Sequence, residues 1–161
     1  MDDAARARFA AARVGRLATV TPAGDPRVVP VAFALVGDVV WTAVDAKPKS
    51  TRRLQRLANV AAHPSVSLLV DHYEEDWSAL WWVRADGTAS VVPVDGSREV
   101  RADGTASVVP ADATSEVHAA LAALAAKYPQ YADPPAGPLI RVAVTTWRAW
   151  SAVPGRPGPP A

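Results

Sequence analysis

A run of basic side chains near the middle of the chain has the clearest chemical character. Residues 47–56 include no acid, and they hold five cations: Lys47, Lys49, Arg52, Arg53 and Arg56. Pro48 suits the first turn of a helix, and the last four cations follow at helical spacing, so they are expected to share one helix face. The opposite, apolar face would consist of Leu54, Leu57, Ala58 and Ala61.

The start of such a helix is a natural place for an anion. The free N–H groups of a first helical turn and the positive end of the helix dipole attract negative charge. Ser50 and Thr51 add hydroxyl donors, and the flanking cations add charge-assisted hydrogen bonds. The run therefore indicates a site for an anionic ligand, and an ordinary solvated helix face is the alternative.

The charge of the chain as a whole is nearly balanced. Net charge is +1 over 161 residues, of which half are hydrophobic and a fifth are charged, as in a single globular domain. This balance argues against a nucleic-acid binder. We find no apolar stretch long enough to span a membrane and no secretory signal, so a cytoplasmic protein is expected.

Side chains that could act as catalysts are scarce. The chain has no cysteine, and its three histidines (His63, His72, His118) do not have metal-ligand spacing, so no metal site is expected. The acidic cluster at 71–76 is better explained as a solvated loop than as an acid–base pair. We therefore assign no catalytic residue, and if the protein is an enzyme, we expect a bound cofactor to supply its reactivity.

Six tryptophans are the second chemical feature. Trp81 and Trp82 are adjacent, so in a strand they would point to opposite faces. Core packing accounts for most of the six, and an exposed one would indicate an interface or a stacking platform.

Turn signals and hydrophobic periodicity divide the chain into short strands and a few helices. Helices are expected from Asp2 or Asp3 to about residue 14, and over 49–60 and 114–128. Strands are expected over 16–21, 27–36, 39–44, 65–73, 78–84 and 139–150, with a turn at 85–87. Pro30 cannot donate to a ladder, which marks an edge strand, a bulge or a ligand-facing gap. A mainly β (α+β) fold, a small barrel with helices outside, fits best.

One segment is repeated letter for letter. The string VRADGTASVVP at 83–93 recurs at 100–110, and the flanking Asp95 and Glu99 recur as Asp112 and Glu116. A tandem duplication of 83–99 as 100–116, tolerated as a surplus surface hairpin, is the simplest account, and an error in the sequence is the alternative. We expect one domain over 1–152 and a disordered Pro/Gly tail at 153–161.

Taken together, these segments resemble a known family. The order GRLATVTPAGDPRVVPVAFAL, VVWTAVDAKPKSTRRLQRLANVAAHPSVSLLVD and DWSALWWVR is similar to the pyridoxamine 5'-phosphate oxidase-like split-barrel proteins, in particular their actinobacterial branch that uses the deazaflavin coenzyme F420. The resemblance covers roughly residues 5–88 and 114–152. It implies a split β-barrel with peripheral helices and a homodimer with the cofactor between the subunits.

The resemblance also implies a set of cofactor contacts. Val29, Pro30 and Val31 would run beside the ring of the cofactor. The phosphate would be held by Lys47, Lys49, Ser50, Thr51 and Arg52, although the family more often has a basic residue at position 50. The anionic tail would meet Arg53 and Arg56, and Trp77 and Trp81 would lie near the cleft.

The function expected from this resemblance is hydride transfer between reduced F420 and a small organic substrate. One alternative is an FMN-dependent oxidase or reductase on the same barrel. Another is a non-catalytic carrier of F420, which the scarcity of acid–base residues would suit. A nucleic-acid contact through the basic helix is the least favoured hypothesis, because the overall charge is balanced.

Overall fold

The computed structural model describes residues 3–44, 51–94, 99–100, 106–107, 111–135 and 137–153. Within these, α-helices (α), 3-10 helices (η) and strands (β) follow one another as α1 (Asp3–Ala11), β1 (Gly15–Val20), β2 (Pro26–Val31), β3 (Ala34–Val36), β4 (Val39–Ala43), α2 (Thr51–Ala62), β5 (Ser65–His72), η1 (Trp77–Ala79), β6 (Trp81–Val92), β7 (Glu99–Val100), β8 (Ala106–Ser107), α3 (Ala111–Lys127), η2 (Pro129–Tyr131) and β9 (Leu139–Ser151). None of the described helices combines the length and the apolar character that crossing a membrane requires.

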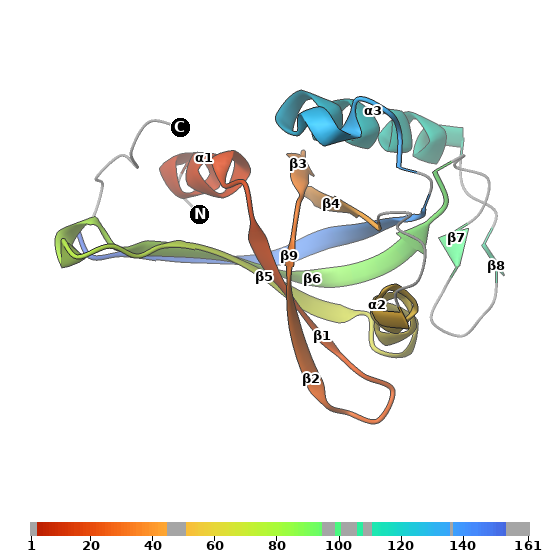
Figure 1. The fold of residues 1–161 in the computed structure, drawn as a ribbon, viewed down its shortest axis with the longest axis horizontal. Coiled ribbons are helices and arrows are strands. Elements are labelled where there is room, and N and C mark those ends of the chain that lie inside the picture. The colour runs from red at the N-terminus through yellow and green to blue at the C-terminus, as the bar shows by residue number, and fades with distance from the viewer. Residues whose placement is uncertain are drawn as a thin grey trace.

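One antiparallel sheet organises the chain. Its main path runs β2-β1-β5-β6-β9-β4-β3, and β7 and β8 lie off this path. Figure 1 shows β5, β6 and β9 extending together as a long arm with η1 at its tip, α1 lying over the arm, α3 beside β3 and β4, and α2 on the other side of the sheet. Pro30 lies in β2, an end strand of this path, as its missing N–H predicts.

The two ends of this path are neighbours in the chain. Only Ala32 and Phe33 separate β2 from β3, although these strands stand at opposite ends of the sheet. Three residue steps span at most about 11 Å. The sheet must therefore curl until its ends almost meet, and because β2 and β3 do not pair in the described ladder, the barrel stays split.

The link between β2 and β3 is the first difference from the expected elements. A single strand was expected over 27–36, but it breaks at Phe33, whose side chain is fully buried. The Tyr128 hydroxyl accepts a hydrogen bond from the Phe33 N–H at 3.0 Å and lies 2.9 Å from the carbonyl oxygens of Phe33 and Arg13. A tertiary contact from Tyr128, the residue after α3, thus replaces the ladder partners that Phe33 lacks at the break.

The expected turn at 85–87 is also wrong, because β6 continues through it as a central strand. Its ladder with β9 shifts register between Asp86 and Gly87, which is a β-bulge. A Cβ on Gly87 would stand 2.3 Å from the carbonyl oxygen of Ala143, so only glycine fits there. Bulges and turns both favour glycine, and the sequence signal is the same for each.

The interior divides into two packed clusters. The first lies within the curl of the sheet and includes Phe9, Leu17, Phe33, Leu68 and Ile140. The second lies under α3, where Trp41, Leu124 and Leu139 are almost fully buried. Trp147 packs edge-on against Phe9 with ring centroids 4.8 Å apart, so core packing does account for part of the tryptophan content.

Lys127 joins both clusters to the end of α1. Its ammonium donates a 2.7 Å hydrogen bond to the carbonyl oxygen of Ala10 and lies 4.0 Å from the Phe33 ring centroid. Burial, and to a smaller extent the charge of Arg13, together lower the pKa of Lys127 from 10.5 to about 8.

This pKa shift predicts a pH dependence of stability. Between about pH 8 and pH 10.5 the unfolded chain holds a proton on Lys127 that the folded chain has released. The free energy of unfolding of the parent should therefore rise with pH across this window relative to that of Lys127→Met, and the difference should be constant below pH 8. Urea unfolding of both proteins from pH 7 to 10 measures it, and a flat difference would contradict the shift.

Candidate functional site

Strand β2 presents the first group of expected contacts. Val31 is buried and Val29 packs against the same core cluster, whereas Pro30 is exposed and pairs with Arg16 of β1. Since β2 ends the described strand path, one of its edges carries no ladder partner there. The strand therefore has main-chain groups available to a ligand that lies along its edge.

The second group surrounds the start of α2. Lys47, Lys49 and Ser50 lie outside the described residues. Helix α2 begins at Thr51, and the side chains of Thr51, Arg52 and Arg53 also lie outside the description. Arg56 is half-buried on the helix. The helix start within the basic run is thus confirmed, while the contacts expected of these side chains stay predictions.

A buried hydrogen bond fixes α2 against the sheet. Asn59 is 2% exposed, and its amide donates to the Thr19 hydroxyl of β1 at 2.9 Å. The side-chain amide of Gln55 donates in turn to the side-chain oxygen Oδ1 of Asn59 at 2.9 Å. Asn59 and Val60 are buried while Ala58 is exposed, so the buried face is turned from the one expected. Because β1 pairs with β2, this bond ties the basic helix to the expected ring-binding strand.

A cavity of about 400 Å³ opens beside these elements. This volume lies within the range of small-molecule sites, which is roughly 300–1,000 Å³. Four neighbouring strands and Pro26 of β2 line it: Ala18, Thr19 and Val20 from β1, Ser65, Val66 and Ser67 from β5, Asp86, Gly87 and Thr88 from β6, and Thr145 from β9. Its lining is rich in hydroxyl groups, which can orient a polar ligand.

Asp86 is the charged residue of the cavity wall. Its carboxylate accepts a 2.5 Å hydrogen bond from the Ser67 hydroxyl and pairs with Arg84 Nε at 2.9 Å. Its carbonyl oxygen accepts from the Thr145 hydroxyl at 3.2 Å. The bulge at Asp86/Gly87 thus places a carboxylate that is paired with Arg84 and two hydroxyl groups side by side in the wall of the cavity.

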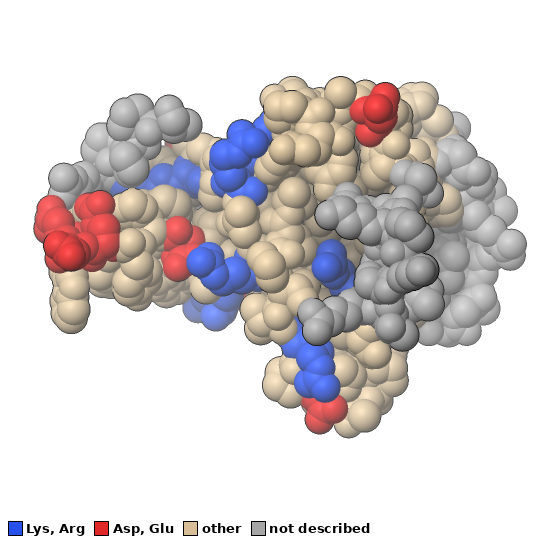
Figure 2. Space-filling view, in the orientation of Figure 1, with Lys and Arg blue, Asp and Glu red and all other residues tan. Residues whose placement is uncertain are grey.

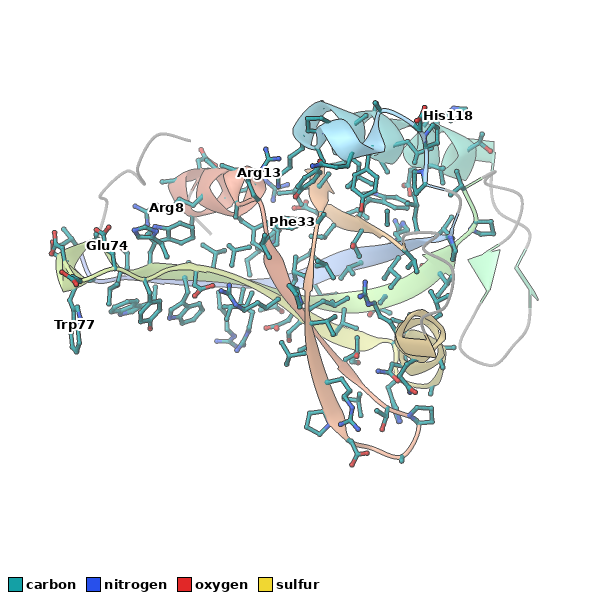
Figure 3. All side chains as sticks on the ribbon, in the orientation of Figure 1. Arg8, Arg13, Phe33, Glu74, Trp77 and His118 are labelled. Carbon is teal, nitrogen blue, oxygen red and sulfur yellow. The ribbon has the colours of Figure 1, made fainter. Side chains whose placement is uncertain are left out.

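The two expected tryptophans lie on the arm, away from this cavity. Trp77 is 77% exposed at the arm tip beside Glu74 (Figure 3), where acidic side chains gather (Figure 2). Trp81 is 9% exposed, with the His72 ring stacked on it at 6.2 Å and the Arg8 guanidinium 5.6 Å from its centroid. Trp81 Nε1 and Arg8 Nε have no hydrogen-bond partner among the described residues.

Within one chain, the residues of the expected site therefore lie in two separate places. Strand β2 and helix α2 flank the same core cluster, whereas Trp77 stands at the far end of the arm (Figures 1 and 3). The sequence interpretation missed the Thr19–Asn59 bond and the cavity wall around Asp86. The only signal in the sequence for the buried Asn59 bond was a polar residue among the apolar residues of the helix. No sequence pattern indicates that Ser67, Asp86 and Thr145 lie together in the fold.

A family model described as pyridoxamine 5'-phosphate oxidase matches residues 1–151 of the chain. No curated protein matches this chain. Among solved structures, the conserved hypothetical protein Rv2991 from Mycobacterium tuberculosis superposes with a TM-score of 0.66 at 20% identity, covering 94% of this chain and 86% of the other.

Two further solved structures share the fold. A FAD-binding protein from Mesorhizobium loti has a TM-score of 0.58 at 19% identity, with 90% of each chain covered. A protein named F420 reductase has a TM-score of 0.54 at 19% identity, covering 92% of this chain and 98% of the other. These likenesses confirm the split β-barrel with peripheral helices that the sequence predicts.

Proposed function

Because the chain belongs to the pyridoxamine 5'-phosphate oxidase family, we propose that it is an oxidoreductase that uses the deazaflavin cofactor F420 and acts on a small organic substrate. The observation that carries this proposal is the start of α2 at Thr51, inside the acid-free run of cations. The fold is shared by a FAD-binding protein and by an F420 reductase, so the choice of cofactor depends on the basic run.

The donor set at this helix start suits a polyanionic cofactor. One phosphate needs only the first N–H groups of the helix and one or two cations. Lys47, Lys49, Ser50, Thr51 and Arg52 are proposed to hold the phosphate of F420. Arg53 and Arg56 continue the same helix, and they suit the glutamate tail that F420 carries beyond its phosphate. This surplus of cations favours F420 over FMN.

Strand β2 is proposed to hold the ring. Within Val29–Val31, every second residue directs its main-chain groups to the unpaired edge of β2, and Pro30 can offer only a carbonyl oxygen because it lacks an N–H. When bound, reduced F420 supplies a hydride to an electron-poor substrate. The chain itself would bind and orient the cofactor and exclude water, which agrees with its scarcity of acid–base residues.

A homodimer would bring the divided site together. Val28, Trp77 and Trp150 are large apolar side chains that are 64%, 77% and 46% exposed, on β2 and on the arm. Exposed apolar groups of this kind favour an interface. In a two-fold dimer the arm of one chain can reach β2 and α2 of the other, so Trp77 and Trp81 would join the site of the partner subunit.

Sedimentation measures the assembly directly. We expect the protein to sediment at twice the mass of one chain, and Trp150→Glu to shift it toward one chain, because a buried unpaired carboxylate opposes association. Glu116→Gln, an exposed change on α3, serves as the control. A parent protein that sediments as a single chain at micromolar concentration would contradict the dimer.

A flavin is the second candidate cofactor, because the FAD-binding protein has the same fold. A carrier that binds F420 without turnover is the alternative outside enzymes. Titration with F420, FMN and FAD separates the cofactors, and turnover of reduced F420 with enones, quinones and nitroaromatics separates the enzyme from the carrier. Tighter binding of either flavin would overturn the choice of F420.

Charge reversal at the helix start tests the proposal by mutation. Lys49→Glu and Arg52→Glu should each weaken F420 binding by about tenfold or more, since a charged hydrogen bond contributes about 1.5–3 kcal/mol. Ala58→Glu is the matched control, because it adds an acid to an exposed position of the same helix outside the basic run. Unchanged affinity in both variants would contradict the site.

A further inference from the structure

The repeated segment supplies the sheet with two copies of one strand. Residues 83–93 and 100–110 are identical. The structure uses the first copy as most of β6, where it pairs with β5 on one side and with β9 on the other. The most heavily paired strand of the barrel is therefore the one that the chain carries twice.

The position that β6 fills makes strict demands on the residues within it. Val83, Ala85, Ala89 and Val92 face the interior and are at most 4% exposed. Gly87 has no space for a Cβ against Ala143. Few unrelated sequences would meet these demands, because volume changes in a packed core are costly.

The second copy meets every one of these demands, since it has the same residue at each position. It also lies next to the strand that it duplicates. Val100 pairs with Val91 of β6, and Glu99–Val100 pairs with Ala106–Ser107 as the surplus hairpin expected from the sequence. A register is specified by the pattern of residues that it buries, and here two registers bury the same pattern.

We propose that residues 100–110 can exchange with residues 83–93 in the sheet, so that the chain has two native strand arrangements. In the exchanged arrangement the second copy pairs with β5 and β9, and the first copy becomes part of the connection that follows η1. This proposal is independent of the cofactor, because it rests only on the repeat and on the surroundings of β6.

The residues before each copy favour the arrangement in the structure. Trp81 and Trp82 precede the first copy, and Trp81 is buried between Arg8 and His72. The corresponding residues before the second copy are Arg98 and Glu99. Exchange would therefore bring one cation toward Arg8 and expose both tryptophans, which disfavours the exchanged arrangement.

The residues after each copy favour the opposite arrangement. The second copy leads directly into α3, whose Val117 is 1% exposed and belongs to the same cluster as Val92. The residues that follow the two copies are also alike. Val117 follows Val109 at the same distance in sequence as Val100 follows Val92, and Asp112 and Glu116 are the duplicates of Asp95 and Glu99. The first copy thus has the more favourable residues before it, and the second copy has the more favourable residues after it. Neither arrangement is favoured at both ends of the strand.

A charge placed in one copy at a time tests the exchange. Ala85 is fully buried, so a glutamate there cannot stay in the sheet without a large loss of stability. We expect Ala85→Glu to fold with the second copy in the sheet, Ala102→Glu to match the parent, and the double variant to unfold at a much lower urea concentration. A midpoint of Ala85→Glu equal to that of the double variant would overturn the proposal, as would failure of Ala85→Glu to fold.

A disulfide reports the exchanged arrangement directly, because the chain has no cysteine of its own. Ser65 and Thr88 are register partners, and Thr105 is the duplicate of Thr88. Cysteines at 65 and 88 should crosslink in the parent background. Cysteines at 65 and 105 should crosslink fully with Ala85→Glu, slowly in the parent and not with Ala102→Glu. Equal crosslinking of the 65/105 pair in all three backgrounds, or none with Ala85→Glu, would contradict the exchange.

Discussion

The short connection between β2 and β3 constrains most of this structure. Two residues must carry the chain from one end of the described strand path to the other, which forces the sheet to curl. The break leaves the main-chain groups of Phe33 without ladder partners, and the Tyr128 hydroxyl meets both of them from the end of α3. Lys127 continues this contact to α1. The contacts of Tyr128 and Lys127 thus hold the connection between β2 and β3 against α1 and the end of α3.

The same curl sets where α2 and the cavity lie. With the core inside the sheet and α1 and α3 on one side, α2 lies on the other side (Figure 1), attached to β1 through Asn59 and Thr19. Strand β2 and helix α2 both contact β1, whereas the cavity wall around Asp86 lies two strands along the sheet, on β6. The arm leads away from β2 and α2, so Trp77 at its tip lies far from both within one chain.

How far the sequence predicted this structure depends on the kind of signal. Alternating β-branched residues and the PAGDP turn predicted the β1–β2 hairpin, and the repeat predicted a surplus hairpin. The strand break at Phe33 has no glycine or proline beside it, and the Tyr128 hydroxyl that satisfies its main chain is far away in the sequence. Gly87 gave a turn signal that a bulge shares. The sequence thus predicted features that depend on neighbouring residues, and it did not predict contacts between residues far apart in the chain.

The proposed function depends on the cationic start of α2 binding the phosphate and glutamates of F420, with the ring alone a weak ligand. Calorimetric titration of the parent protein with F420 and with its deazaflavin ring lacking the phosphate and glutamates compares the two contributions. We expect affinity to fall about a hundredfold or more when the phosphate and glutamates are removed, since at least two charged contacts are lost. Equal affinity for the two compounds would contradict it.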